Sequence, residues 1–468
     1  MTIHRRDFIK HAGLGAAALA APWAVGDTAR AAIRKGHIVP PDQKLNIACV
    51  GCGGQGGQDI YGVGKENIVA LCDVDSERAA GVFKSRPDTP KYTDYRKMLE
   101  EMDEQIDAVT ISTPDHTHFP AAMMAIEMGK HVFVQKPLAH TVWEARQRRL
   151  AARKHGVVTQ MGNQGHAGEG TRLVREWVQG GVIGPVHEVH AWSDHSGKGA
   201  KAPNERPTET PPVPETLDWN LWLGVAPERP YHPAYVPFNW RAWWDFGSCA
   251  LGDMGCHVLD AAFWALNLRY PTSVQAETAE VFEETGPAWS IVTWQFPERD
   301  NIPAHLPEQL KERIRKHFPA RDKMPPVKVV WYDGKKQPPR PKELEDDRKL
   351  GGHGQLLLGE KGTIYEPGAY CQSPRLIPES KMQEAIPNLP PKTIPRIKGS
   401  HYAEWIQACK GGPTPGSNFE HAGPLTEMVL LGNIAIRSGK KIEWDGENLR
   451  CSNVPEANRY VNKEYRVF

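Results

Sequence analysis

A carboxylate and an imidazole stand four residues apart at Asp253 and His257. On a helix, two such side chains share one face and can act on one ligand. The imidazole can then serve as a general base while the carboxylate orients it or the substrate. Gly252 and Gly255 leave room for a ligand beside them. We expect Asp253 and His257 to be catalytic; a capping aspartate and a core histidine are the alternative interpretation.

An amine, Lys136, follows the apolar run Val132–Val134 and precedes Pro137, which fixes the local chain. If the run is a strand of a parallel sheet, ligands bind at its carboxyl end and the ammonium points into the cleft. Lys136 is therefore the third residue that we predict to be catalytic, with an ordinary surface lysine as the alternative.

A glycine pattern, Gly51-x-Gly53-x-x-Gly56, follows the apolar run Leu45–Val50. Gly51 permits a tight turn, Gly53 lets the backbone approach a pyrophosphate, and Gly56 allows a helix to pack closely. Asp73 ends the next apolar run, where it would accept hydrogen bonds from the adenosine ribose hydroxyls and repel a 2′-phosphate. These features predict bound NAD, with NADP less favoured.

The segment Ser112-Thr113-Pro114 ends another apolar run and is expected to touch the same cofactor. His116 and His118 follow it. Two histidines so close suggest a metal site, but on a strand-to-helix turn such residues more often cap or pack, and we predict no metal. The predicted cofactor contacts are Gly51, Gly53, Gly54, Gln55, Gly56, Asp73, Ser112, Thr113, Pro114, His118, Gln135 and Lys136.

An aromatic segment at 237–247 precedes the Asp253 to His257 pair. Aromatic faces pack against the C–H faces of pyranose rings, while polar neighbours can bind hydroxyl groups. Ordinary core packing is the alternative for any single tryptophan. The predicted substrate contacts are Trp240, Arg241, Trp243, Asp253 and His257.

The elements that would position these residues begin at residue 45. Apolar runs alternate there with helical segments, which predicts an α/β fold with a doubly wound parallel sheet, a Rossmann domain at 45–165. The predicted strands are Leu45–Val50, Ile68–Cys72, Ala108–Ser112 and Val132–Val134, and the helices between them include Tyr95–Met102 and Phe119–Met128.

The pattern changes near His166, where longer polar loops predict a second, α+β domain at 166–468 with a large, mostly antiparallel sheet. Arg299–Lys349 is interpreted as a charged insertion carrying one helix, Glu308–Lys316. Late helices that could return to brace the first domain are predicted at His401–Lys410 and Leu425–Ser438. The predicted strands of this domain include Val186–Trp192, Val274–Glu280 and Ile291–Trp294.

The composition narrows the class of partner. With 57 basic and 56 acidic residues in 468, the chain lacks the charge excess of a nucleic-acid binder or a membrane-surface protein. After the N-terminus no apolar run approaches the roughly 20 residues of a membrane span. The spacing of the eight cysteines is typical neither of a disulfide framework nor of a zinc site. We expect a small-molecule substrate.

The N-terminus has the form of an export signal. Arg5-Arg6-Asp7-Phe8-Ile9-Lys10 has the twin-arginine pattern, followed by the weakly apolar stretch Ala12–Val25 and a possible cleavage site at Ala29-Arg30-Ala31. We therefore predict a signal peptide at 1–31, a linker at 32–44, and a periplasmic or other extracytoplasmic location. Because this route exports folded proteins, the cofactor would travel with the protein.

The segment Gly129–Leu138, with the sequence GKHVFVQKPL, resembles the G-K-H-V-x-x-E-K-P signature of the Gfo/Idh/MocA family. Together with the glycine turn and the segment Gly252–His257, the resemblance runs from about residue 45 to the C-terminus. It implies that Lys136 sits by the nicotinamide, with Asp253 and His257 facing it across a sugar or polyol, and that the chain is a homo-oligomer. The family's glutamate is Gln135 here, which removes a charge that would favour the ammonium form of Lys136.

The resemblance and the site together predict an NAD(P)-dependent oxidoreductase acting on the CH–OH group of a sugar, polyol or glycoside. One alternative is an NAD-dependent glycoside hydrolase or lyase that oxidises C3 transiently and eliminates the aglycone. It would explain an exported enzyme that lacks a means to reoxidise its cofactor. Another alternative is a noncatalytic NAD-binding or sugar-binding protein.

Overall fold

The computed structural model describes residues 33–195, 203–300, 312 and 323–468. The predicted signal peptide at 1–31 and the predicted helix Glu308–Lys316, apart from residue 312, lie outside the described residues. Within the described part, no helix is both long enough and apolar enough to cross a membrane.

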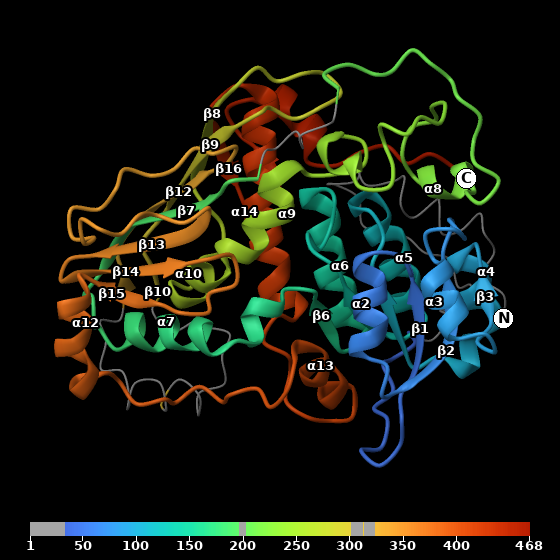
Figure 1. Cartoon of the computed structure of the whole chain (residues 1–468), viewed down its shortest axis with the longest axis horizontal. Coiled ribbons are helices and arrows are strands. Elements are labelled where there is room, and N and C mark those ends of the chain that lie inside the picture. Colours follow the sequence, from blue (N-terminus) through green and yellow to red (C-terminus); the bar gives the residue numbers. More distant parts are fainter. Residues whose placement is uncertain (1–32, 196–202, 301–311, 313–322) are drawn as a thin grey trace, which may run out of the picture.

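The first sheet has six parallel strands in the order β3-β2-β1-β4-β5-β6. Helices lie on both of its faces (Figure 1), which confirms the predicted doubly wound α/β architecture. The strands are β1 Asn46–Val50, β2 Asn67–Cys72, β3 Lys91–Tyr92, β4 Ala108–Ile111, β5 His131–Val134 and β6 Thr159–Met161. The helices are α2 Gln55–Gly62, α3 Ala80–Ser85, α4 Tyr95–Glu101, α5 Asp115–Glu127 and α6 Val142–His155.

The second sheet has nine strands in the order β15-β14-β13-β7-β12-β9-β8-β16-β17. Every pair in it is antiparallel except β7 with β12, so the expectation of a mostly antiparallel sheet is confirmed. The strands are β7 Val186–Ser193, β8 Ser273–Thr278, β9 Ser290–Phe296, β12 Val327–Tyr332, β13 His353–Gly359, β14 Gly362–Pro367, β15 Arg375–Ile377, β16 Ile442–Asp445 and β17 Arg450–Cys451. A separate short ladder joins β10 Arg299–Asp300 to β11 Lys323–Met324.

The interpretation of Arg299–Lys349 as a charged insertion was wrong for Val327–Tyr332, which forms strand β12. Strand β12 lies in the centre of the nine-stranded sheet, between β7 and β9, and five of its six residues are buried. Its sequence, VKVVWY, has the apolar, β-branched and aromatic composition of a central strand. The charged residues on both sides concealed this short run in the sequence.

Helices α9 Cys249–Val258, α10 Asp260–Ala265 and α14 Phe419–Ser438 cover the inner face of the large sheet, with α7 Glu169–Gln179 farther along it (Figure 1). Helix α14 also packs on α6 of the first sheet's layer, so it touches both halves of the molecule. It begins six residues before the predicted Leu425, because Asn418 caps its start and Pro424 is tolerated within it.

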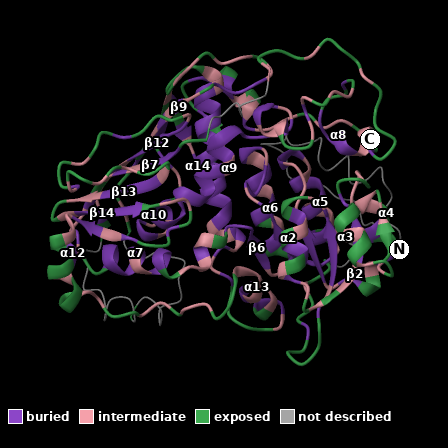
Figure 2. Ribbon diagram, in the orientation of Figure 1, coloured by how far each residue is buried: buried purple, intermediate pink, exposed green. Residues whose placement is uncertain are grey.

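Figure 2 shows the buried residues concentrated along this α9 to α14 layer and through the strands of the first sheet. Trp405 and Cys409 of helix α13 His401–Cys409 belong to one buried cluster with Leu45, Ile47 of β1 and Phe133 of β5. All eight cysteines lie in the described part, where they are buried and free.

Candidate functional site

A cavity of about 400 Å³ lies at the carboxyl ends of β1, β2, β4 and β5, and we call it the nucleotide cavity. In open parallel sheets this edge is where ligands bind. Its wall contains most of the predicted cofactor contacts and two of the predicted substrate contacts. These are Gly51, Gly53, Gly54, Gln55, Asp73, Ser112, Thr113, Pro114, Gln135, Lys136, Trp240 and Arg241.

The glycine turn is shaped so that only glycine fits two of its positions. Gly51 has a φ of +83°, and a Cβ there would lie 2.6 Å from the carbonyl oxygen of Ser112. A Cβ on Gly56 would lie 2.1 Å from the carbonyl oxygen of Gly51, well inside van der Waals contact. Helix α2 therefore starts directly against the turn, with its N-terminus toward the cavity, as phosphate binding requires.

Asp73 lies at the end of β2, where its carboxylate accepts from the backbone N–H groups of Cys52 at 2.7 Å and Gly53 at 3.3 Å. Its other oxygen accepts from the N–H of Asp75 at 2.9 Å. Burial raises the pKa of Asp73, and the three backbone hydrogen bonds oppose that rise. The carboxylate thus links the glycine turn to β2, and it remains part of the cavity wall.

Arg78 is a residue of the nucleotide cavity that the sequence analysis did not single out. Its stem lies over the glycine turn, since a Cβ on Gly53 would come 2.4 Å from its Cγ. Its guanidinium lies beside Gly54, where a Cβ would come 2.9 Å from Nη2. A guanidinium at this place can pair with a phosphate. No local motif marks it, because Arg78 comes from the loop that follows β2.

Gln135, the position where the family signature has glutamate, hydrogen-bonds to a carboxylate from α2. Its Nε2 lies 3.0 Å from both oxygens of Asp59. Asp59 also accepts from Ser112 at 2.5 Å and from Tyr402 at 2.7 Å. The amide of Gln135 thus serves as a donor to the buried carboxylate of Asp59, a role that a carboxylate at position 135 could not fill.

The two histidines after the Thr113 turn are buried and bonded to backbone carbonyl groups. His118 lies between the carbonyl oxygens of Pro137 at 2.9 Å and Thr113 at 2.8 Å. His116 lies between those of Phe246 and Trp222. His118 is predicted to touch the cofactor, but the structure places it behind the turn, where it joins the ends of β4 and β5.

Two of the predicted catalytic residues make contact beside the nucleotide cavity, which Lys136 and Arg241 line. Lys136 donates to the carboxylate of Asp253, and Arg241 Nε lies 3.4 Å from the same oxygen. Lys136 follows β5, Arg241 belongs to the aromatic segment, and Asp253 lies on α9. His257 lies one helical turn after Asp253 on the same helix. Asp253 thus provides the negative charge beside Lys136 that Gln135 cannot.

Asn163, which the sequence analysis missed, fixes the orientation of His257. Its Nδ2 donates to the carbonyl of Cys256 at 2.9 Å, so its Oδ1 is the atom that faces His257 Nδ1 at 2.8 Å. An amide oxygen accepts only, and Nδ1 must therefore carry the proton while Nε2 keeps the lone pair. Tyr370, 37% exposed, packs its ring edge-on against the imidazole at 5.0 Å.

Burial and neighbouring charges set the protonation of this pair. Burial lowers the pKa of His257 to about 3, and the charge of Lys136 adds to the effect. Burial alone would raise the pKa of Asp253, but the charges of Lys136 and Arg241 outweigh it and hold the pKa below its ordinary value. At neutral pH the site therefore contains a neutral imidazole, the form in which a general base can accept a proton, and a carboxylate paired with Lys136.

The aromatic segment divides into a part that faces the cavity and a part that belongs to the core. The Arg241 guanidinium stacks on Trp240 at 4.2 Å and on Phe238 at 4.1 Å, and all three line the cavity. Trp243, predicted to touch the substrate, is fully buried, and its indole N–H donates to the carbonyl of Ala234 at 3.1 Å. Trp243 therefore belongs to the core that supports the aromatic segment.

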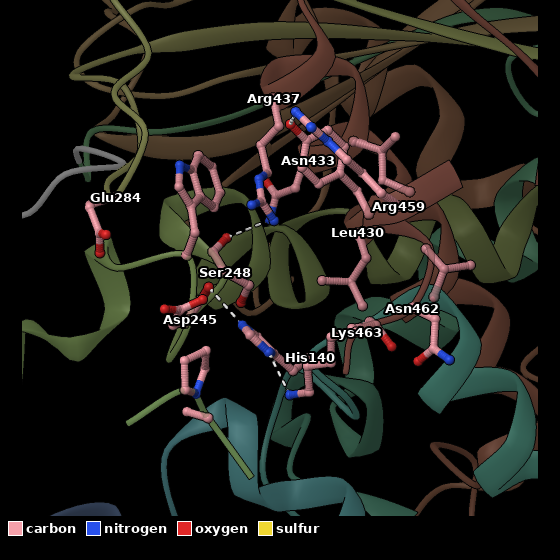
Figure 3. Close-up of a pocket in the computed structure, with 18 of the residues that line it drawn as sticks. His140, Asp245, Ser248, Glu284, Leu430, Asn433, Arg437, Arg459, Asn462 and Lys463 are labelled. Carbon is pink, nitrogen blue, oxygen red and sulfur yellow. Dashed lines mark hydrogen bonds between the residues drawn. The ribbon is translucent and has the colours of Figure 1, made fainter. Parts of the chain in front are cut away.

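A second cavity, of about 730 Å³, lies beyond the start of α9 (Figure 3). None of the predicted site residues line it. His140 accepts from Lys463 at 2.8 Å and contacts the carbonyl of Gly247 at 3.2 Å. Ser248, also in its wall, donates to the buried carboxyl of Asp115 at 2.5 Å.

Comparison with known proteins locates the chain among oxidoreductases. A family model described as "Oxidoreductase family, NAD-binding Rossmann fold", of the Gfo/Idh/MocA group, matches residues 45–163. Its companion, described as the C-terminal alpha/beta domain of the same oxidoreductase family, matches residues 171–303. Together they cover more than half of the chain. The first domain is therefore an NAD-binding Rossmann domain, as predicted.

Two curated relatives align with part of the chain. A protein of Shewanella pealeana named glycosyl hydrolase family 109 protein is 32% identical over 167 residues, which are 31% of this chain and 36% of that protein. An uncharacterized oxidoreductase, YrbE, of Bacillus subtilis is 30% identical over 130 residues, 28% of this chain and 38% of that protein. The chain thus spans less than half the length of these relatives.

Solved structures share the whole fold. The WlbA dehydrogenase of Bordetella pertussis, in complex with NADH and UDP-GlcNAcA, superposes with a TM-score of 0.57 and 16% identity, covering 86% of this chain and 99% of that one. An inositol dehydrogenase homolog of Azotobacter vinelandii, complexed with NADH and myo-inositol, has a TM-score of 0.54 and 16% identity, covering 86% and 98%. At such low identity the likeness is one of fold.

Proposed function

Since the chain belongs to the Gfo/Idh/MocA family of oxidoreductases, we propose that it oxidises a CH–OH group of a sugar, polyol or glycoside with NAD. The observation that carries this proposal is the contact of Lys136, in the wall of the nucleotide cavity, with Asp253, which lies one helical turn before His257 on α9. A neutral base, a fixed cation and an orienting carboxylate are the groups that alcohol oxidation needs.

The residues of the cavity fit a dinucleotide. The glycine turn and the start of α2 would hold the pyrophosphate, and Asp73 would bind the adenosine ribose, which favours NAD over NADP. Gly51 and Gly56 leave no space for a side chain, so the backbone itself forms the cradle. When bound, NAD supplies the acceptor for a hydride.

The chain's own residues handle the hydroxyl group. His257 takes the hydroxyl proton at Nε2, because Asn163 keeps the other proton on Nδ1. Lys136 donates to the substrate oxygen and stabilises the charge that develops there. Asp253 holds the lysine in place, and Arg241 with Trp240 offers a charged and aromatic wall for the ring.

Replacement of His257 tests this assignment. The His257→Ala variant should retain bound NAD but lose reduction of that NAD by sugars, by about 10²- to 10⁴-fold in rate. Stopped-flow absorbance of the nicotinamide measures the rate across a panel of sugars, polyols and glycosides. The His232→Ala variant removes an imidazole from outside the cluster and is the control. Unchanged reduction in His257→Ala would refute the role.

A second candidate function is cleavage of glycosides, favoured by the relative named glycosyl hydrolase family 109 protein. Hydride loss at C3 acidifies the neighbouring C–H, the aglycone leaves by elimination, water adds, and the hydride returns to C3. The net reaction is hydrolysis, with no change of the cofactor. Release of aglycone from a chromogenic glycoside, without net nicotinamide reduction, distinguishes cleavage from oxidation.

We also propose that residues 1–31 direct twin-arginine export to a periplasmic or other extracytoplasmic location. The pattern of Arg5 and Arg6 followed by Phe8 supports it. Export with bound NAD would favour a reaction that regenerates its cofactor within each turnover. Cell fractionation of the Arg5→Lys, Arg6→Lys double variant tests export, and light scattering of the purified protein tests the expected homo-oligomer.

A further inference from the structure

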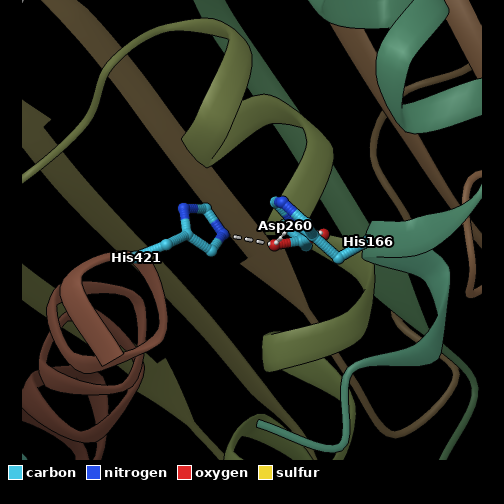
Figure 4. A group of neighbouring side chains, drawn as sticks. All are labelled: His166, Asp260 and His421. Carbon is cyan, nitrogen blue, oxygen red and sulfur yellow. Dashed lines mark hydrogen bonds and ion pairs between the residues drawn. The ribbon is translucent and has the colours of Figure 1, made fainter. Parts of the chain in front are cut away.

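Two imidazoles and one carboxylate from distant parts of the chain meet behind the reaction site. His166 belongs to the short helix Gln164–Ala167, Asp260 begins α10, and His421 lies in the first turn of α14 (Figure 4). His166 Nδ1 lies 2.9 Å from one oxygen of Asp260, and His421 Nε2 lies 2.7 Å from the other. The three potential ligand atoms lie within 4.8 Å of one another.

We propose that His166, Asp260 and His421 bind a divalent transition-metal ion, with Zn²⁺ the preferred ion. Imidazole nitrogen and carboxylate oxygen are ligands that Zn²⁺ takes in proteins, whereas Ca²⁺ and Mg²⁺ prefer sites made of oxygen alone. Three protein ligands leave the fourth tetrahedral position for water. The proposal does not depend on hydride transfer.

The burial and charge of Asp260 support a bound cation. Its side chain is 3% exposed, and within the described residues it pairs with no lysine or arginine, only with the two imidazoles. The nearby Arg172 is directed elsewhere, because its guanidinium donates to the carbonyl oxygens of Pro395, His166 and Gly168. Buried carboxylates are ordinarily paired with a cation or bound to a metal.

Aromatic rings form the surroundings of the cluster. The His166 ring lies 4.8 Å from that of Trp264, and the His421 ring lies 5.6 Å from that of Phe263. Such walls hold the imidazoles in place and lower the local polarity, which strengthens the attraction of a carboxylate for a metal ion. A metal at tetrahedral distances needs ligand atoms roughly 3.3 Å apart. The distances from Asp260 to His166 and to His421, 2.9 Å and 2.7 Å, would therefore increase by about half an ångström.

An ion could reach this place from solvent. A cavity of about 730 Å³ has His421, Trp264 and Gly416 in its wall. His421 is the most exposed of the three proposed ligands, at 10% of its side chain, and His166 lies deepest, at 0%. The entry path therefore runs past His421, which makes that residue the one to substitute with least disturbance of the core.

The position of the cluster suggests what a bound metal would stabilise. Asn163, which orients His257, lies directly before the short helix that carries His166, and Asp260 follows His257 by three residues. Two contacts thus join the segment 163–166 to the segment 257–260. One is between Asn163 and His257, and the other is between His166 and Asp260. A metal ion bound by His166 and Asp260 would hold the Asn163–His257 contact rigid.

Metal binding by the full chain tests the proposal directly. The protein is stripped with a chelator, dialysed, and titrated with Zn²⁺ in a calorimeter. Co²⁺ is then used as a spectroscopic probe, because its visible absorption reports tetrahedral nitrogen and oxygen ligands. The expected result is one equivalent of tightly bound Zn²⁺ that displaces Co²⁺. Failure of the wild-type chain to bind one equivalent would mean a metal-free, hydrogen-bonded cluster and would overturn the proposal.

Variants separate this site from adventitious surface binding. His421→Ala should weaken Zn²⁺ binding at least about 100-fold, beyond the loss that removal of an outer-shell partner causes. His421→Cys keeps a ligand at that place and should restore most of the affinity. The control is His353→Ala, in the exposed group Asp194, His195 and His353, and it should bind as the wild type does. Equal affinity in His421→Ala and wild type would sink the assignment.

Discussion

The two halves of the site are assembled in different ways. The glycine turn of the nucleotide cavity belongs to one continuous stretch of chain, in which strand, turn and helix follow one another from Asn46 to Gly62. The reaction cluster combines the end of β5, the aromatic segment, α9 and Asn163. The first half is specified by backbone shape, whereas the second is specified by which polar side chains meet after folding.

This difference leads to an expectation about variants. Changes in the glycine turn should affect cofactor binding and leave the chemistry of any bound cofactor intact. Changes in the reaction cluster should lower the rate and leave cofactor affinity intact. The predictions below go from the largest expected effect to the smallest, and each compares the two halves.

The Gly56→Ala variant should abolish NAD binding. The new Cβ would lie 2.1 Å from the carbonyl oxygen of Gly51, and a backbone atom in a tight turn cannot move aside without opening the cradle. Gly57→Ala is the matched control, because its Cβ would meet the Cys52 carbonyl at 3.4 Å, an ordinary contact. Calorimetric titration with NAD measures both. Normal affinity in Gly56→Ala would show that backbone shape does not specify this half.

The Gln135→Glu variant, which restores the residue of the family signature, should destabilise the protein on the order of 2–4 kcal/mol. The new carboxylate would face that of Asp59, where the amide now donates to both oxygens at 3.0 Å. Thermal and denaturant unfolding measure the loss. The variant lies at the border of the two halves, so NAD affinity should fall as well.

Rescue distinguishes charge repulsion from a simple packing defect. In the double variant Gln135→Glu, Asp59→Asn the roles of donor and acceptor are exchanged, and most of the stability should return. Asp59→Asn alone leaves two amides in contact and is the reference for the cycle. If the double variant is no more stable than Gln135→Glu, the like charges are not the cause.

The strands, the parallel sheet and the glycine turn could be predicted because each leaves a local trace, as in the run before Gly51. Asn163 and Arg78 could not. Nothing at Asn163 shows that it faces His257, because the contact joins residues 94 positions apart. The strand Val327–Tyr332 was missed for a related reason, since its buried place depends on β7 and β9 rather than on its charged neighbours.

The Asn163→Asp variant should move the pH dependence of the rate. Burial keeps the pKa of His257 far below its ordinary value, so the base stays neutral and the wild-type rate should hold down to acidic pH. A carboxylate at 163 would favour the imidazolium and raise that pKa, and the rate should then fall at a higher pH on the acid side. Pre-steady-state reduction of bound NAD, followed against pH, gives both profiles.

The Asn163→Ala variant completes this test, because it removes the acceptor without adding charge. Its rate should fall about 10- to 100-fold at every pH while NAD affinity stays unchanged, since His257 loses the partner that fixes its tautomer. A structural role alone would instead change thermal stability and NAD affinity together, with no difference in pH profile between the two variants.

The Arg78→Ala variant should have the smallest effect, a loss of about 5- to 10-fold in NAD affinity at low salt with an unchanged rate of reduction once NAD is bound. Arg78 is exposed and lies on the glycine turn, so it would pair with the pyrophosphate and not with the ribose bound by Asp73. Affinities for NAD and NADP should therefore fall equally. Arg86→Ala, whose guanidinium lies against Gly64, is the control. A loss confined to NADP would place Arg78 at the 2′-phosphate and show that a side chain, as well as the backbone, sets specificity in this half.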